Sequence, residues 1–263
     1  MNHMTKRLAV LFGGQSSEHE VSCKSVQNVL KCMDPERYEV ILIGITKEGK
    51  WLKVDSVESI RNDTWRDSRV SAVISPDATQ KCLIVDDGTD ISKVRIDAVF
   101  PIIHGNVGED GKLQGLLEMA GIPYVGCGVL SSAVTMDKFF TKLIVEDIGT
   151  IRQADFELIL ARKLPRKLEE YCDKVESRFT YPVFVKPCNG GSSCGVSRAG
   201  SREELKDALN KAAEFDVKIL VEEFIEGREI ECASDYGIAR NEDYNESQGY
   251  RHPVFSKKFL FNF

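Results

Sequence analysis

The sequence predicts an α/β protein in which an N-terminal, doubly wound parallel sheet is followed by a smaller α+β domain. In residues 1–125, short apolar runs alternate with stretches in which apolar residues recur at helical spacing, as in a parallel sheet covered by helices. In residues 126–233 the later elements follow as strand, loop, helix and strand, which is typical of a small α+β domain. We therefore expect two domains, with residues 234–263 as an atypical tail.

The composition indicates a globular protein and argues against several other classes. Hydrophobic residues make up 42% and charged residues 29% of the 263 residues, as in globular proteins. The net charge of −6 argues against nucleic acid as a partner, and no apolar run is long enough to span a membrane. None of the 8 cysteines forms a Cys-x-x-Cys pair, so we expect no zinc site, and reduced thiols as in the cytoplasm.

The first predicted unit is a strand, a glycine turn and a helix. The strand covers 8–12, and Ser17 and Glu20 have the spacing of a capping box that would start the helix. Ligands gather at the carboxyl ends of such strands, where Glu18 lies. Glu18 could bind an ammonium group or merely favour the helix N-terminus electrostatically, and the residues alone favour the second interpretation.

Further strands are predicted at 38–45, 51–54, 82–85 and 96–103, whereas 55–80 is polar and irregular. The strand 96–103 runs into His104 and a glycine-rich turn that contains Glu109 and Asp110. These side chains could meet a ligand at the carboxyl end of the strand, or the acids could cap the next helix, and both interpretations stay open. That helix has a clear apolar face and ends at Gly121.

The second domain begins with a helix. Apolar residues from Ala133 to Leu143 have helical spacing, and Gly149 is a C-cap candidate. Lys138 and Lys142 lie one turn apart on the polar side, where most lysines are solvated. We further expect a strand at 154–160, helices at 163–176 and from Ser201, where Glu204 completes a capping box, and a strand at 218–222.

The stretch YPVFVKPCNGGSSCGVS, residues 181–197, carries the strongest chemical signal. Its apolar start suits a buried strand, at whose end Lys186 is followed by a loop of glycines and serines. Successive N–H groups in such a loop can form an anion-binding nest, so that a lysine beside it suits phosphate. A flexible hairpin tip after an edge strand explains the loop equally well, and neither a Walker A loop nor a placed G-x-G-x-x-G is present.

Five sequence blocks occur in a characteristic order. They are FGGQSSEHEVS, PIIHGNVGEDGKLQGLLEMAGIPYVG, SSAVTMDK, YPVFVKPCNGGSSCGVS and ILVEEFIEGREIECA. Together they resemble the D-alanine–D-alanine ligase family of ATP-grasp enzymes, over residues 7–233 apart from 55–95. The segment ILIGITKEGKW and the polar insertion after it are closer to the D-alanine–D-serine ligases of vancomycin resistance. The resemblance implies a pre-ATP-grasp domain followed by an incomplete ATP-grasp domain.

The resemblance also implies an activity. Such ligases use ATP and Mg²⁺ to phosphorylate the carboxylate of one D-alanine, and the amino group of a second D-amino acid then attacks the acyl phosphate. The product serves peptidoglycan synthesis, cell-wall biogenesis and cell shape, and a cytoplasmic homodimer acting on small molecules is the implied form. The second substrate, D-alanine, D-serine or D-lactate, stays open. A relative of biotin carboxylase is a weaker alternative, because the HGNVGEDG block and Glu18 count against it.

The resemblance implies a site residue by residue. The nucleotide would be held by Lys138 and Lys186 at the phosphates, Gly191, Ser192 and Ser193 in a closing loop, Glu222 and Ile225 at adenine, and Glu229 at the ribose hydroxyls. Glu18 would bind the ammonium group of the first substrate and hydrogen-bond toward Ser192, which makes these two the implied catalytic residues. His104 would lie beside the substrate carboxylate.

The tail departs from the family pattern after Ala233. Residues 241–248 contain no aliphatic side chain and three acids, and the family's magnesium ligands have no counterpart here, so no residue is assigned to a metal. We expect that 234–263 do not complete the sheet, that the strand at 218–222 has an exposed edge or face, and that deleting 236–263 changes stability little. The alternative to a ligase is an inactive nucleotide- or D-alanine-binding remnant.

Overall fold

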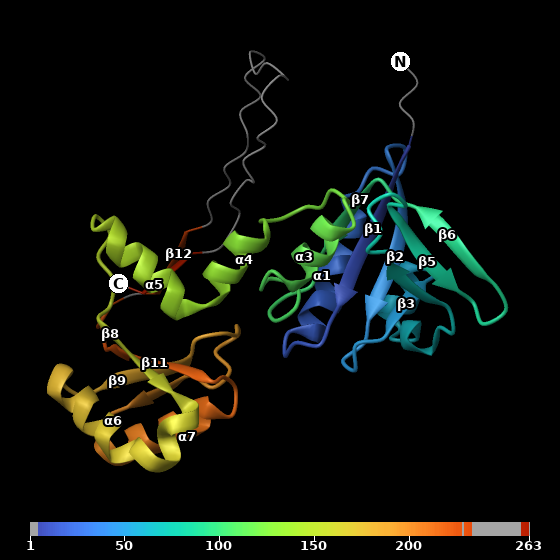
Figure 1. The fold of residues 1–263 in the computed structure, drawn as a ribbon. Coiled ribbons are helices and arrows are strands. Elements are labelled where there is room, and N and C mark those ends of the chain that lie inside the picture. Colours follow the sequence, from blue (N-terminus) through green and yellow to red (C-terminus); the bar gives the residue numbers. More distant parts are fainter. Residues whose placement is uncertain (1–4, 228, 233–258, 263) are drawn as a thin grey trace. The chain divides into compact units, whose positions relative to one another are not determined.

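The computed structural model describes residues 5–227, 229–232 and 259–262, and these divide into two compact units. The division falls between Ala133 and Val134, within helix α4 (Val129–Met136), and the domain boundary expected after residue 125 stays a prediction. Figure 1 shows the elements of each unit, which are described separately below. In the part of the chain that the structure describes, no helix is both long and apolar enough to cross a membrane.

The first unit is built on a seven-stranded sheet in the order β6-β5-β4-β3-β2-β1-β7. Its strands are β1 (Lys6–Gly13), β2 (Tyr38–Ile45), β3 (Trp51–Val54), β4 (Ser71–Ile74), β5 (Cys82–Asp86), β6 (Ile91–Arg95) and β7 (Ala98–Pro101). The strands β7, β1 and β2 are parallel, and β3 to β6 extend the sheet antiparallel. The predicted α/β class is confirmed, with a parallel centre in a mixed sheet.

Helices cover both faces of this sheet because β1 is apolar on both sides. Leu8 and Phe12 share one core cluster with Val26 of α1 (His19–Lys31), and Leu11 shares another with Leu117 of α3 (Lys112–Met119). An apolar strand buried on both faces is the signature of a parallel sheet between helices. Because β1 and β7 pair in parallel, their carboxyl ends lie at one edge of the sheet.

The antiparallel extension lies where the sequence pattern is weak. The stretch 55–80 forms α2 (Val57–Arg61), the 3-10 helix η1 (Trp65–Asp67) and β4. Strand β6 was not predicted, because four of its five residues are exposed and no apolar alternation marks it. The predicted strand 96–103 is shorter in the structure, since β7 covers only its middle.

The predicted capping box at the start of α1 is wrong. The helix begins at His19 with Glu18 as N-cap, and no side chain caps it. The serine next to Ser17 takes a different role: the Ser16 Oγ accepts from the Glu18 N–H at 3.1 Å and donates to the His104 carbonyl at 2.7 Å. A long-range contact thus replaces the local cap that the spacing of Ser17 and Glu20 predicts.

The second unit is built on a four-stranded antiparallel sheet in the order β10-β9-β11-β8. Its strands are β8 (Phe156–Leu160), β9 (Val183–Pro187), β10 (Ser197–Ala199) and β11 (Lys218–Glu223). Two helices, α6 (Leu164–Arg178) and α7 (Arg202–Ala213), share a core cluster with Val185 and Val221. The 3-10 helix η2 (Ala161–Lys163) directly precedes α6. Phe139 of α5 (Lys138–Ile148) packs with Phe156 and Leu220 in a separate cluster. In Figure 1, α5 lies on the side of the sheet away from α6 and α7.

The helix predicted through Ala133 and Leu143 is two helices in the structure. The chain leaves the helix at Asp137, whose carboxylate accepts the N–H groups of Phe139 and Phe140 and so begins α5. The apolar spacing runs on across the break, which is why the sequence pattern predicts one helix. The predicted C-cap at Gly149 and the Ser201 cap of α7 are confirmed.

The expectation of an exposed edge or face at 218–222 is wrong. Strand β11 lies between β8 and β9, and Ile219, Leu220 and Val221 are fully buried. The final strand β13 (Phe259–Asn262) pairs antiparallel with β12 (Glu229–Cys232) in a two-stranded sheet of their own. The rest of the tail, 233–258, lies outside the described residues, so its expected lack of burial stays a prediction.

We expect Ile219→Ala to lower the free energy of unfolding by about 2–5 kcal/mol, because it leaves a cavity at the centre of the second unit's sheet. Urea unfolding followed by circular dichroism measures this loss. Val217→Ala is the control, since its side chain is 70% exposed and its removal should cost about 0.5 kcal/mol or less. A loss for Ile219→Ala as small as that of the control would restore the exposed-edge interpretation.

Candidate functional site

A cluster of lysines surrounds one buried carboxylate in the second unit. Glu222 of β11 forms ion pairs with Lys142 of α5, at 3.0 Å, and with Lys186 of β9. The three side chains are only 8%, 14% and 17% exposed, respectively. A carboxylate removed from water needs such counter-charges, so the cluster is an ionic unit rather than three surface groups.

Strand alternation explains why these side chains meet. Val185 and Val221 point into the core beneath α6 and α7, so their neighbours Lys186 and Glu222 point to the opposite face of the sheet. Lys142 reaches the cluster from α5 and also donates to the Ala154 carbonyl at 2.8 Å. The expectation that Lys138 and Lys142 are solvated is therefore wrong.

Lys138 ties the start of α5 to the glycine–serine loop. Its Nζ donates to the Gly190 carbonyl at 2.8 Å and lies 3.4 Å from the Cys188 carbonyl. Burial lowers the pKa of Lys138, and the nearby charge of Lys186 lowers it further. Two ammonium groups thus lie near one another beside the loop, an arrangement that favours binding of an anion.

A polar network fixes the base of the same loop. The Asp137 carboxylate forms an ion pair with Lys218 and lies 3.5 Å from the Asn189 side-chain nitrogen. Asn189 donates its backbone N–H and its side-chain amide to Asp216, at 2.7 and 2.9 Å. The loop therefore leaves β9 from a rigid anchor, and Lys138 is held next to it.

The loop itself contains several residues with positive φ. Ser192 and Ser193 have φ of 51° and 56°, a conformation that costs energy for residues other than glycine and gathers at functional sites. At Gly195 a Cβ would lie 2.7 Å from the Phe215 ring and 2.8 Å from Pro187, so only glycine fits. Both serines are exposed at the tip, while the base of the loop is packed. The loop joins β9 to β10, and β9 is an interior strand, so the edge-strand part of the alternative interpretation is wrong.

The cysteines at this loop are ordinary packing residues. Cys188 is buried beneath it, and burial raises the pKa of its thiol to about 12. The cysteines whose side chains are described, Cys188 and Cys194 included, are free thiols. The interpretation of Cys188 and Cys194 as small loop residues is the one that the structure favours.

The end of β11 presents aromatic and aliphatic surface. Phe224 stacks on Phe184 with ring centroids 5.8 Å apart, and the Arg198 guanidinium lies 5.5 Å from the Phe224 ring. Ile225 follows and is 38% exposed. Of Glu229 only the backbone is described, in β12. A partly exposed apolar surface next to a cationic cluster is a combination that suits a nucleotide.

In the first unit, the predicted substrate residues meet at the carboxyl ends of β1 and β7. Ser16 bridges the backbone of Glu18 and His104, and the His104 Nε2 lies 3.2 Å from the Ser25 Oγ. A Cβ placed on Gly105 would be 2.7 Å from a Glu18 carboxylate oxygen, which locates that carboxylate beside the turn. The Glu18 carboxylate and the turn that begins at His104 are therefore neighbours.

The two other acids of this turn shape the backbone. Glu109 accepts from the Gly105 N–H, and Asp110 accepts from the N–H groups of Val107 and Lys112, the first residue of α3. Burial opposes ionisation of Asp110, but its bonds to Lys112 and to the backbone hold its pKa below the ordinary value. Asp110 thus lies at the start of α3, but the N-cap is Gly111 and no side chain caps the helix, so the capping interpretation is not confirmed and both interpretations stay predictions.

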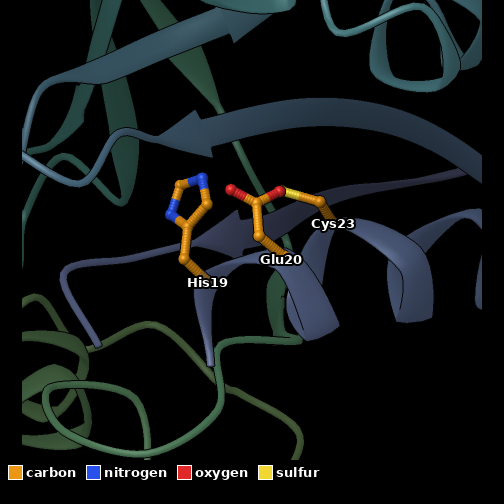
Figure 2. A group of neighbouring side chains, drawn as sticks. All are labelled: His19, Glu20 and Cys23. Carbon is orange, nitrogen blue, oxygen red and sulfur yellow. The ribbon is translucent and has the colours of Figure 1, made fainter. Parts of the chain in front are cut away.

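One group of potential metal ligands appears among the described residues. His19, Glu20 and Cys23 of α1 have donor atoms within 4.8 Å of one another. Figure 2 shows these three neighbouring side chains. The Arg66 guanidinium lies 3.0 Å from the His19 Nε2, and Lys47 forms an ion pair with Glu20 at 2.9 Å. Burial raises the pKa of the Cys23 thiol to about 11. Two cations and a protonated thiol do not suit a metal ion, and Mg²⁺ also prefers oxygen ligands.

The predicted residues thus fall into two groups. The structure brings Lys138, Lys186 and Glu222 together near the loop of the second unit, and Glu18 and His104 together in the first. The sequence missed the part that Lys142 plays. Its only signal was the spacing of four residues from Lys138, which places both lysines on one face of a helix.

Comparison with known proteins gives a consistent result. The family model for the D-ala D-ala ligase N-terminus matches residues 7–127, and that for the D-ala D-ala ligase C-terminus matches 144–259. The second match continues past residue 233, where the five quoted blocks end. Together the two matches cover most of the chain.

Individual relatives agree with the family models. The D-alanine–D-alanine ligases of Caldicellulosiruptor bescii and Ruminiclostridium cellulolyticum are 48% and 49% identical over 235 and 240 residues, which are 88% and 87% of this chain. The chain spans 63% of the length of each. Among solved structures, the VanG D-Ala:D-Ser ligase from Enterococcus faecalis is 33% identical with a TM-score of 0.80, covering 97% of this chain and 76% of that one. The D-alanine–D-alanine ligase from Coxiella burnetii, also 33% identical, has a TM-score of 0.73 over 87% and 66%.

We expect the stability of the wild-type chain relative to Lys138→Met to increase with pH. The folded protein holds the Lys138 proton more weakly than the unfolded chain does, so raising the pH removes a cost of folding. The gain should develop between the lowered pKa of the folded state and 10.5, the ordinary value, and then level off. Urea unfolding of both proteins at about pH 7 and about pH 10 measures the difference. A wild-type advantage that stays constant or shrinks would contradict a lowered pKa.

Proposed function

Because the chain belongs to the D-alanine–D-alanine ligase family, we propose that it acts in an ATP-dependent ligation of D-alanine to a second D-amino acid. The reaction would proceed through D-alanyl phosphate and supply a precursor of peptidoglycan. The observation that carries the proposal is the group of ammonium side chains beside a strained glycine–serine loop, Lys138 and Lys186 with Ser192 and Ser193. Cations and backbone N–H groups of this kind stabilise the charge of a transferring phosphoryl group.

The proposed nucleotide site combines the lysine cluster and the glycine–serine loop with the apolar surface at the end of β11, all in the second unit. Lys138 and Lys186 would pair with the phosphates, and the loop at Gly191, Ser192 and Ser193 would cover them through its N–H and hydroxyl groups. The apolar surface at Ile225 would receive the adenine ring, together with Glu222. ATP, when bound, supplies the phosphoryl group. Glu229 is the proposed ribose ligand by family resemblance alone.

The proposed D-alanine site lies in the first unit. The Glu18 carboxylate would accept the ammonium group of the first D-alanine, and His104 would lie at the substrate carboxylate. Ser16 supports both positions, since it bonds the backbone of each residue. The carboxylate oxygen attacks the γ-phosphorus and ADP leaves; the amino group of the second substrate then attacks the acyl carbon and phosphate leaves. Glu18 and Ser192 are proposed as the catalytic residues of the family.

The proposal also covers the metal ion, the second substrate, the oligomeric form and the cellular compartment. Mg²⁺ is the family's expected ion, but no described residue of this chain is assigned to it, and no step here passes through it. D-serine is a second candidate acceptor, because the VanG structure is named a D-Ala:D-Ser ligase. A cytoplasmic homodimer is the proposed form, and the free thiols of the described residues agree with a reducing compartment.

A second candidate function is nucleotide or D-alanine binding without turnover. The observation that favours it is the same group of ammonium side chains beside the loop, because these cations can bind a nucleotide without transferring its phosphate. Both candidates require the same nucleotide site, and they differ in whether ATP is consumed.

We expect Lys186→Ala to weaken binding of a non-hydrolysable ATP analogue by about tenfold or more, because a cation paired with phosphate in a desolvated site is lost. Isothermal titration calorimetry measures the affinity. The thermal midpoint should change little, since Lys142 keeps the Glu222 carboxylate paired. Equal affinities of the wild type and the variant would remove Lys186 from the nucleotide site.

Phosphate release in the presence of ATP, Mg²⁺ and D-alanine separates the two candidate functions. A ligase releases phosphate only when D-alanine is present, and the dipeptide appears in equal amount, which mass spectrometry verifies. Parallel reactions without D-alanine are the control, and reactions with added D-serine test the acceptor. Nucleotide binding without D-alanine-dependent release would establish the binding protein instead.

A further inference from the structure

The Glu222 carboxylate has two cationic partners, and the two differ in how firmly they are held. We propose that Lys142 is a positioning residue that keeps Glu222 neutralised and in place when a nucleotide draws Lys186 away. The inference rests on the proposed nucleotide site and adds a residue to it. Lys142 itself touches no phosphate in this account and acts through Glu222 and Lys186.

Lys142 is fixed by several contacts besides Glu222. Its Nζ donates to the Ala154 carbonyl at 2.8 Å and lies 5.1 Å from the centroid of the Phe156 ring. The backbone carbonyl of Lys142 accepts from the Gln153 side chain at 2.9 Å, which joins the helix to the segment before β8. An ammonium held by a carboxylate, a carbonyl and an aromatic face has little freedom to move toward a ligand.

Lys186 is held differently. Within the part of the chain that the structure describes, its ammonium has one polar partner, the second oxygen of the Glu222 carboxylate. The side chain lies at the end of β9, directly before the loop whose base is fixed by Asn189 and Asp216. Breaking a single ion pair frees this lysine, so it is the one that can turn to an incoming phosphate.

The energetics require a second cation. The Glu222 side chain is only 8% exposed, and a buried carboxylate that loses its last counter-charge pays a large desolvation cost. With Lys142 in place, transfer of Lys186 to phosphate leaves Glu222 paired. Without Lys142, Lys186 is the remaining partner, and nucleotide phosphate must compete with Glu222 for the same ammonium. Lys142 therefore raises nucleotide affinity without contacting the nucleotide.

The chain contains a matched control on another part of the same sheet. Glu157 of β8 is 9% exposed and is likewise shared by two cations, Lys174 and Arg178 of α6. Neither of these cations is part of the proposed nucleotide site. Lys174→Met therefore removes one of two partners of a buried carboxylate, as Lys142→Met does, but leaves Lys186 and the loop unchanged.

The test is calorimetric titration of the full 263-residue chain with adenylyl imidodiphosphate, a non-hydrolysable ATP analogue. We expect Lys142→Met to weaken binding about tenfold and Lys174→Met to leave the affinity unchanged, in line with the coupling energies of residues in one ionic network. Thermal melts of both variants report any loss of stability separately. If Lys142→Met does not fold, Lys142→Gln, which keeps a donor for Ala154 but loses the charge, takes its place with the same expected loss.

A double-mutant cycle shows whether Lys142 acts through Glu222. In a Glu222→Gln background there is no carboxylate to neutralise, so adding Lys142→Met should change the affinity less than twofold, whereas in the wild-type background it costs about tenfold. Equal losses in both backgrounds, or a Lys142→Met affinity equal to wild type, would overturn the inference and leave the proposed function standing. Absence of analogue binding by the wild-type chain would overturn both.

Discussion

The buried ion-pair cluster around Glu222 is the interaction on which the second unit's site depends. It joins β11 to β9 through Lys186 and to α5 through Lys142, so one carboxylate connects three elements. Burying an unpaired carboxylate costs much free energy, so both lysines are held where they can pair with it. Lys138, the loop and the aromatic surface at Phe224 lie around this cluster. Strand alternation places Lys186 and Glu222 on the face of the sheet opposite α6 and α7.

Backbone contacts organise the first unit in a comparable way. Ser22 accepts the Gly13 N–H at 2.7 Å and donates to the Ile102 carbonyl, so it ties the ends of β1 and β7 together. Ser16 makes the second such link, between Glu18 and His104. Two small hydroxyl side chains thus fix the loops that carry the larger functional groups, which is the support that a precise binding site requires.

Sequence patterns predicted most of the elements because burial and periodicity agree in them. Strands β1, β2 and β11 and helix α7 are apolar on the faces that are buried, and their signals are local. Strand β6 is mostly exposed and carries no such pattern, and the break between α4 and α5 depends on the side chain of Asp137. The position of β11 inside its sheet depends on strand pairing, which composition does not report.

Only part of the site could be predicted from the sequence. Motifs indicated Lys186 and its loop, because glycine, serine and lysine have a chemical meaning in sequence. The role of Lys142 was not predictable, because it requires a helix and two strands to converge on one carboxylate. The link that Ser16 makes between Glu18 and His104 was not predictable either, because it depends on a contact across 88 positions of sequence.

The most direct test of this account is a crystal structure of the chain with adenylyl imidodiphosphate bound. The account predicts the phosphate groups against Lys138, Lys186 and the loop of residues 190–195, with Lys186 turned away from Glu222 and Lys142 still paired with it. Phosphate density elsewhere on the molecule, or a complex in which Lys142 leaves Glu222 while Lys186 stays, would contradict it.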